Sequence, residues 1–91
     1  YNTLTGASVT LSGGNYYVPA GVTNTSIDFG YTIGTALYVA GTVNFDRKSE
    51  FYMAANTKLV VLPGGKVTFN IASGFEQSGI VVAIHEQGQL N

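Results

Sequence analysis

The stretch from Lys58 to Ala72 constrains the fold of this chain more than any other part of the sequence. A short apolar run, Leu59 to Leu62, is followed by Pro63-Gly64-Gly65 and then by apolar residues at every second position. Proline lacks a backbone donor and glycine accepts a positive φ, so the chain is expected to turn there, with Gly64 or Gly65 at positive φ. Alternation is typical of a strand with one buried face. It predicts Val67, Phe69 and Ile71 facing the core, with Thr68 and Asn70 facing water.

Strand-forming residues separated by glycines run through the rest of the chain. Twelve of the 91 residues are glycine, and the segments between them are rich in Val, Thr, Tyr, Phe and Ile. This composition is typical of all-β proteins. Strands are expected at Thr3–Leu11, Asn15–Val18, Thr25–Phe29, Ala36–Val39, Thr42–Phe45, Glu50–Met53, Lys58–Leu62, Lys66–Ala72 and Gly79–His85.

Four apolar triplets recur at a nearly constant spacing. Tyr16-Tyr17-Val18, Leu37-Tyr38-Val39, Leu59-Val60-Val61 and Ile80-Val81-Val82 follow one another at intervals of 21, 22 and 21 residues. A repeat of this length is typical of solenoids, which makes a short parallel β-helix of about four coils one candidate architecture. The Leu-Pro-Gly-Gly-Lys turn favours the other candidate, because it reads most simply as an antiparallel hairpin or a sandwich corner.

We therefore expect a single all-β domain of the β-sandwich or jelly-roll type, with the short parallel β-helix as the alternative. Residues 1–11 form an N-terminal arm or first strand, and residues 12–91 form the domain. The arm carries no charge, and Leu4, Val9 and Leu11 are its apolar residues that could anchor it in a sheet. Its strand could pair with an edge of its own molecule or be donated to a neighbouring subunit.

The triplets also predict an apolar outer surface. All three residues of each triplet are apolar or aromatic, so both faces of those strands are expected to be covered. In a two-layer domain this leaves Tyr17, Tyr38, Val60 and Val81 as an outer stripe. Together with Leu4, Val9 and Leu11 in the arm, these residues are the predicted assembly interface.

Composition limits the partners. Charged residues make up 10% of the chain and the net charge is −1, which provides no electrostatic footprint for nucleic acid or an anionic membrane. The longest strictly apolar run, Ile80 to Ile84, is far shorter than the twenty or so residues that span a bilayer. A 91-residue domain without cysteine has a small core, so the expected source of added stability is association with copies of itself.

Catalytic and metal-binding patterns are weak throughout the sequence. His85-Glu86 could be half of an acid–base pair, but a lone histidine at a strand end is usually a half-exposed polar residue. The run from Asn44 to Glu50 resembles a calcium loop in its oxygen ligands, but Arg47 and Lys48 interrupt it and the loop glycine is missing. Glu76 and Asp28 have no evident carboxylate partner. No enzyme activity, metal or cofactor is predicted.

Two features of the sequence suggest that the protein binds a glycan or carries one. Tyrosines at positions 1, 16, 17, 31, 38 and 52 could form a platform on which sugar rings stack, so a carbohydrate-binding module of a secreted protein is the rival interpretation. Asn24-Thr25-Ser26 is an N-glycosylation sequon, which makes Asn24 a candidate glycosylation site if the protein is exported. The chain begins at Tyr1 rather than Met, which we interpret as a processed chain or an excised domain.

The Pro-Gly-Gly corner followed by Val67-Thr68-Phe69 resembles corners of extracellular β-sandwich domains. With its low charge, its lack of cysteine and its uncharged arm, the chain is similar to subunits of prokaryotic surface filaments that assemble by strand donation. The resemblance implies a non-enzymatic structural or adhesive subunit that self-assembles into an extracellular filament or surface appendage. A fragment of a β-helical adhesin or tailspike is a further alternative.

Overall fold

Eleven short strands make up the described part of the chain. A computed structural model of the protein describes residues 1–28, 34–45, 57–69, 80–84 and 89–90. Within these ranges there are strands and no helix, which confirms the all-β prediction. The strands are β1 (Asn2–Thr3), β2 (Val9–Thr10), β3 (Gly14–Val18), β4 (Thr23–Asn24), β5 (Ile27–Asp28), β6 (Thr35–Val39), β7 (Thr42–Phe45), β8 (Thr57–Val61), β9 (Lys66–Phe69), β10 (Ile80–Ile84) and β11 (Gln89–Leu90).

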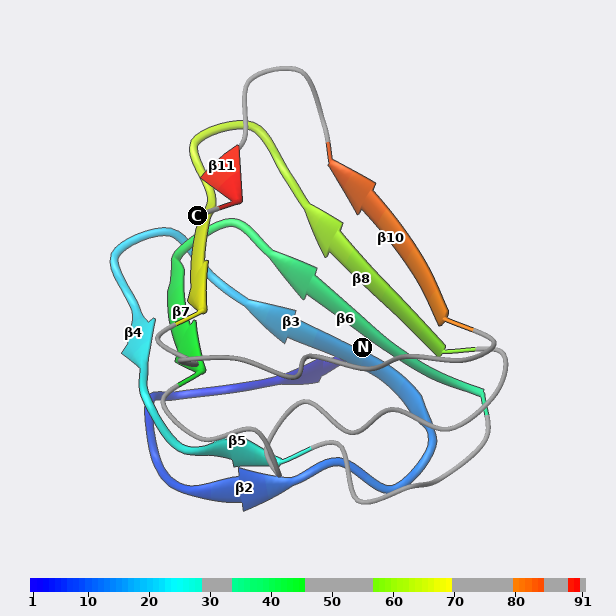
Figure 1. The fold of residues 1–91 in the computed structure, drawn as a ribbon. Coiled ribbons are helices and arrows are strands. Elements are labelled where there is room, and N and C mark those ends of the chain that lie inside the picture. The colour runs from blue at the N-terminus through cyan, green and yellow to red at the C-terminus, as the bar shows by residue number, and fades with distance from the viewer. Residues whose placement is uncertain (29–33, 46–56, 70–79, 85–88, 91) are drawn as a thin grey trace.

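Every strand pair among the described residues is parallel, and the pairs form three sheets (Figure 1). The five-stranded sheet has the order β1-β3-β6-β8-β10, the four-stranded sheet has the order β11-β9-β7-β4, and β2 pairs with β5. In the largest sheet Tyr16 lies opposite Leu37, and Leu37 lies opposite Leu59. The first three triplets therefore stack in register, at the spacing that the sequence predicts.

The expected antiparallel hairpin at Pro63-Gly64-Gly65 is wrong. The strands on either side of this turn belong to different sheets: β8 pairs with β6 and β10, whereas β9 pairs with β7 and β11. The backbone of the turn bonds instead to the previous turn of the chain. The N–H of Leu62 donates to the carbonyl of Val39 at 2.8 Å, and the N–H of Lys66 donates to the carbonyl of Gly41 at 2.9 Å. The Pro-Gly-Gly segment is thus a corner between two sheets, stacked on an earlier corner.

Two glycines make room for this stacking. A Cβ atom on Gly65 would overlap the carbonyl oxygen of Val39, and a Cβ on Gly41 would overlap the carbonyl oxygens of Pro19 and Val22. Gly64, next to Gly65, has a different requirement: its φ is +79°, but the space around it is open. The positive φ expected at Gly64 or Gly65 is confirmed at Gly64.

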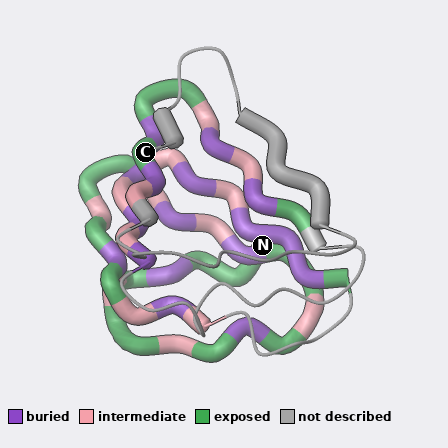
Figure 2. Tube along the Cα trace, in the orientation of Figure 1, coloured by how far each residue is buried: buried purple, intermediate pink, exposed green. Residues whose placement is uncertain are grey.

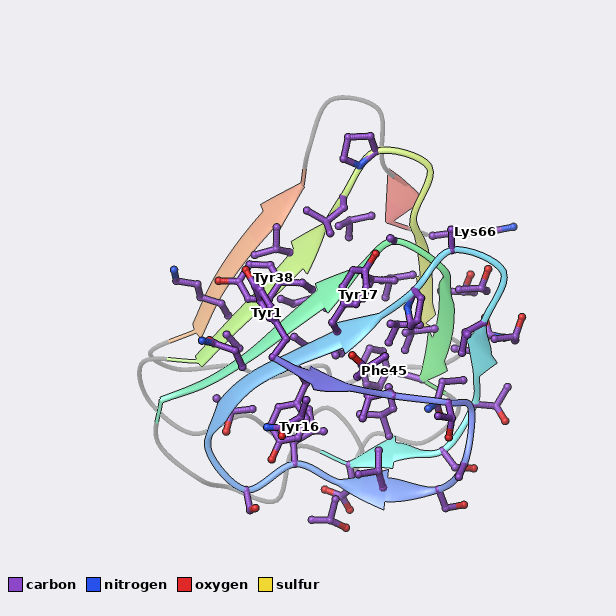
Figure 3. All side chains as sticks on the ribbon, turned by 180° about the vertical axis from the view of Figure 1, so that it is seen from behind. Tyr1, Tyr16, Tyr17, Tyr38, Phe45 and Lys66 are labelled. Carbon is purple, nitrogen blue, oxygen red and sulfur yellow. The ribbon has the colours of Figure 1, made fainter. Side chains whose placement is uncertain are left out.

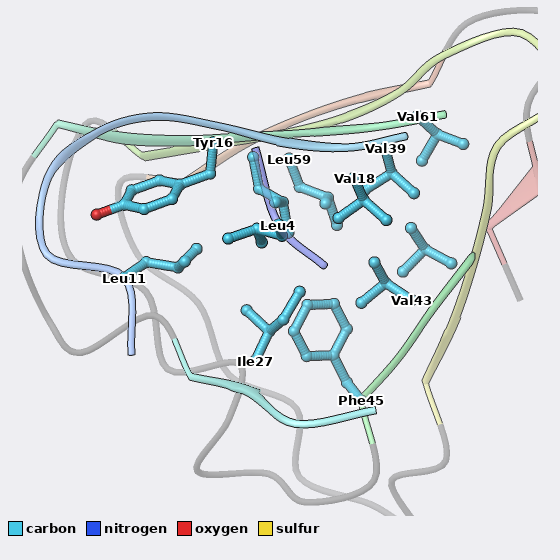
Figure 4. Packing of buried hydrophobic residues seen from close by; sticks show 12 residues of the cluster. Leu4, Leu11, Tyr16, Val18, Ile27, Val39, Val43, Phe45, Leu59 and Val61 are labelled. Carbon is cyan, nitrogen blue, oxygen red and sulfur yellow. The ribbon is translucent and has the colours of Figure 1, made fainter. Parts of the chain in front are cut away.

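The core lies between the sheets, and its residues alternate with less buried ones along several of the described strands. Buried and less buried positions alternate along β3 and β8 (Figure 2). Among the residues predicted from alternation, Val67 is buried as expected, whereas Thr68, expected to face water, is half-buried; the side chain of Phe69 and residues 70 and 71 lie outside the description. The buried cluster, seen in Figure 4, consists of Leu4, Leu11, Tyr16, Val18, Ile27, Leu37, Val39, Val43, Phe45, Leu59, Val61 and Val67.

Two buried hydroxyl groups support the turn before β3. The hydroxyl of Tyr16 accepts a hydrogen bond from the N–H of Ser12 at 3.1 Å, and the Thr35 hydroxyl accepts one from the N–H of Gly13 at 3.0 Å. Thr35 is fully buried. The two bonds hold this turn to β3 and β6, which supply the hydroxyls.

The N-terminal arm is two short strands rather than one. The strand expected at Thr3–Leu11 is interrupted at Gly6, whose φ is +96°, so that β1 pairs with β3 and β2 pairs with β5. Of the two predicted partners for the arm, the structure uses an edge of the same molecule. The strand expected at Thr25–Phe29 is β5, shorter than predicted, whereas the one expected at Glu50–Met53 lies outside the described residues.

Because the corners stack, alanine at Gly64 and alanine at Gly65 should lower the free energy of unfolding by different amounts. Gly64→Ala should lower the free energy of unfolding by about 1 kcal/mol, because only the positive φ is unfavourable. Gly65→Ala should cost at least about 3 kcal/mol, because the new Cβ forces the corners apart. Urea denaturation followed by circular dichroism measures both. Equal costs at the two positions would contradict the stacking of this corner on the previous one.

Phe45 is the largest fully buried side chain among the described residues, and its loss should be severe. Phe45→Ala should lower the free energy of unfolding by about 3–5 kcal/mol or unfold the protein, because it leaves a large cavity. Thr68→Ala, at a half-buried position of the neighbouring strand β9, should cost less than about 1 kcal/mol. The same denaturation experiment compares the two variants, and similar losses would show that the inner and outer faces are wrongly assigned.

Candidate functional site

An aromatic surface lies on the outer face of the five-stranded sheet. Tyr17 of β3 is in register with Tyr38 of β6, and Tyr38 is in register with Val60 of β8. All three are half-buried, while their neighbours along each strand point into the core. Because neighbouring strands lie about 4.8 Å apart, side chains at one register position form a continuous column. The outer stripe predicted from the triplets is therefore continuous from Tyr17 to Val60.

The ring of Tyr1, the residue before the edge strand β1, packs against the rings of this column. Its ring centroid lies 5.4 Å from that of Tyr38 with the rings at 86°, and 6.2 Å from that of Tyr17 with the rings at 51°. These are edge-to-face and tilted arrangements, which aromatic pairs favour over a face-to-face sandwich. Figure 3 shows the three rings grouped over β3 and β6. The side chain of Tyr1 is 82% exposed.

The three rings and Leu62 enclose a shallow groove of about 280 Å³, which we call the tyrosine groove. Leu62 follows β8, two residues beyond Val60, and is half-buried. None of the four lining side chains is charged. The groove therefore offers apolar ring faces together with phenol hydroxyls, which donate and accept hydrogen bonds.

The predicted sugar-stacking platform is only partly assembled by the fold. Of its six tyrosines, Tyr1, Tyr17 and Tyr38 meet in the tyrosine groove, and Tyr16 faces the core. Tyr31 and Tyr52 lie outside the described residues. Sequence reasoning named Tyr1 without placing it against the outer stripe, because nothing in a linear pattern shows that β1 joins this sheet beside β3. Leu62 was missed as a lining residue because it was read as the end of a strand.

The predicted assembly residues fall into two groups. Leu4 and Leu11 are buried in the core of their own chain, and Val9 packs against that core, so these arm residues cover the interior. Tyr17, Tyr38 and Val60 lie on the outer face.

Val81 was aligned with Val60 in the sequence, but it is in register with Lys58. Ala83 takes the position opposite Val60, because the last repeat is longer by two residues than the triplets suggested.

Asn24, the candidate glycosylation site, is fully buried near the end of β4. Its side-chain nitrogen Nδ2 donates to the carbonyl of Ala7 at 3.3 Å, and its Oδ1 accepts from the N–H of Ser26 at 3.1 Å. These two bonds fasten the turn between β4 and β5 to the segment before β2. A glycan on Nδ2 would require this side chain to leave its buried position.

Other sequence candidates lie largely outside the description. His85, Glu86 and Glu76, and residues 46–50 of the run compared with a calcium loop, are not among the described residues. Within the residues that are described, no three His, Cys, Asp or Glu side chains come together in a way that could hold a metal ion. The same part of the chain contains no helix long and apolar enough to cross a membrane.

Comparison with protein-family models, with curated proteins and with solved structures finds no match to this chain. Its function is therefore inferred from the strand arrangement and the tyrosine groove.

The buried position of Asn24 predicts that its amide serves the fold. Asn24→Ala should lower the free energy of unfolding by about 1–3 kcal/mol, because the N–H of Ser26 and the carbonyl of Ala7 lose their partner. Ser26→Ala is the matched control: it destroys the sequon but keeps the backbone N–H, so its cost should be below about 0.5 kcal/mol. Thermal denaturation of protein made without glycosylation measures both, and a harmless Asn24→Ala would contradict the structural role.

Proposed function

We propose that the chain is a short parallel β-helix, the alternative architecture that the sequence left open. The support is the register: among the described strands, each partner in the largest sheet beyond β3 lies 21 to 23 residues along the chain. Successive corners also bond to one another, as the hydrogen bonds from Ala40 and Gly41 to Val18 and from Leu62 to Val39 show. Parallel pairing between successive repeats, with stacked corners, is the arrangement of a solenoid.

We further propose that the chain is a non-enzymatic structural or adhesive unit that self-assembles end to end into an extracellular filament or surface appendage. The observation that carries this proposal is the pair of unlike edges of the five-stranded sheet. Among the described strands, β1 forms one edge and β10 the other. Since all five strands run in the same direction, β10 of one copy and β1 of the next have the relative orientation of neighbouring strands within the sheet.

Contact between two different edges is heterologous, and a heterologous contact that does not close into a ring builds a filament. Unpaired strand edges are a recognised template for such pairing. A chain of 91 residues has a small core, so burial at each joint would add to its stability. The filament subunits that the sequence resembles also assemble through sheet edges, but the arm of this chain pairs with its own sheet, so we propose stacking of edges without strand donation.

The same edges would accept further coils of a longer chain in a β-helical adhesin or tailspike. The two cases differ in the partner of β1, which is a second molecule in a filament and the same molecule in a longer solenoid. The Thr3→Pro variant tests the filament case.

The edge proposal gives Thr3 a specific role. The N–H of Leu4 donates to the carbonyl of Tyr17, so it points towards β3. Backbone groups of successive residues in a strand point in opposite directions, so the N–H of Thr3 points away from β3 towards the free edge. Proline at this position removes an edge donor and leaves the bond of Leu4 in place.

Thr3→Pro should therefore stop end-to-end association and change the free energy of unfolding by less than about 1 kcal/mol. Size-exclusion chromatography with light scattering, followed by negative-stain microscopy, measures the assembly. Thr3→Ala keeps the donor and should assemble like the wild type. Filaments of normal length from Thr3→Pro, or a wild-type protein that stays monomeric at every concentration, would contradict the proposal.

A further inference from the structure

We propose that the tyrosine groove binds a neutral sugar ring. This function goes beyond assembly, since the groove opens on the face of the five-stranded sheet and the proposed joint uses its edges. The occupant is inferred from three properties of the groove: the arrangement of its rings, its lack of charged side chains and its size.

The arrangement of the rings leaves aromatic faces available to a ligand. Tyr1 meets Tyr38 edge to face, at 86°, so the edge of one ring lies against the face of the other and less face area is covered than in a parallel stack. Tyr17 is tilted by 51° from Tyr1 and supports it from the neighbouring strand. The face of an aromatic ring carries negative charge density, which attracts weakly positive C–H groups. One side of a pyranose ring is made of such groups.

The polar groups of the groove suit the hydroxyls of a sugar. Each tyrosine carries a phenol hydroxyl that can donate and accept a hydrogen bond. A sugar ring has hydroxyls around its rim and apolar C–H groups on its faces, so one molecule can satisfy both kinds of surface. An apolar groove with a few polar groups around it is the usual form of a small-ligand site.

Charge argues against two other occupants. Proteins that stack nucleobases on aromatic side chains also supply a positively charged track for the phosphates, but no lining side chain is charged and the chain has a net charge of −1. A cluster of aromatic rings can also bind a quaternary ammonium ion. Lys58, exposed and in register with Ala36 two residues from Tyr38, puts a positive charge on the same face and disfavours a cation.

Size argues against a protein partner at this site alone. The groove has a volume of about 280 Å³, close to the lower limit of about 300 Å³ for small-molecule sites. A stable protein interface needs about 800 Å² from each partner, which extends far beyond four side chains. One sugar unit, free or at the end of an oligosaccharide, matches the groove better than a folded partner.

The experiment titrates the neutral disaccharides cellobiose, maltose and lactose into ¹⁵N-labelled protein, up to about 10 mM, because a site of one ring is expected to bind in the millimolar range. At least one of the three should shift the amide signals of residues around Tyr1, Tyr17 and Tyr38. The titration is run on Thr3→Pro as well as on the wild type, so that binding is measured whether or not the chain assembles.

Two variants of Tyr1 test the ring itself, and both should fold because this side chain is 82% exposed. Tyr1→Ala should weaken binding about tenfold or more, whereas Tyr1→Phe, which keeps the ring, should stay within about threefold of the wild type. Tyr16→Phe changes a tyrosine on the opposite, inner face and should leave the dissociation constant unchanged.

Three results would overturn the proposal. One is that none of the disaccharides shifts any signal near the groove. Another is that Tyr1→Ala binds as tightly as Tyr1→Phe. The third is that tetramethylammonium chloride, titrated in the same way, binds more tightly than every sugar, because the rings would then be a cation site.

Discussion

The close approach of backbone at the stacked corners is the constraint on which the rest of this structure depends. Gly41 and Gly65 stand where a Cβ would overlap carbonyl oxygens of the preceding corner. With no side chain there, the N–H of Lys66 reaches the carbonyl of Gly41, and the N–H of Thr42 reaches that of Val22. These bonds fix where β7 and β9 enter their sheet, because Thr42 and Lys66 are their first residues, and a parallel strand that starts at a fixed position has a fixed register.

Register in turn decides which residues meet on each face. With Tyr16, Leu37 and Leu59 in line, the core receives one large apolar side chain at this level from each of β3, β6 and β8. The residue after each of these, at Tyr17, Tyr38 and Val60, must then point outwards, because side chains alternate along a strand. A shift of one residue would bury the groove tyrosines and expose the core. The aromatic surface is thus a direct consequence of how the corners stack.

The sequence predicted the parts of this fold that depend on local pattern. The triplets marked the positions of β3, β6 and β8, and the alternation after Pro63 predicted the buried Val67. The parallel register of the triplets followed only from the β-helix alternative, not from the favoured sandwich. Prediction failed where the partner of a segment decides the outcome. A Pro-Gly-Gly turn is compatible with a hairpin or with a corner, and only the bonds to the earlier corner distinguish them. The last repeat was misaligned by two residues because Ile80-Val81-Val82 and Val82-Ala83-Ile84 are equally apolar.

The candidate site was harder to predict than the fold, because it depends on pairing between segments far apart in the sequence. Nothing near Tyr1 in the sequence indicates that β1 lies beside β3, so its meeting with Tyr17 and Tyr38 follows only from the pairing of Thr3 with Tyr17. That pairing also relates the two proposed functions. A strand added at β1 would extend the sheet within its own plane, about 4.8 Å from Thr3, whereas the groove opens perpendicular to that plane. Assembly at this edge would therefore extend the sheet beyond β1 and leave the ring faces open to a sugar.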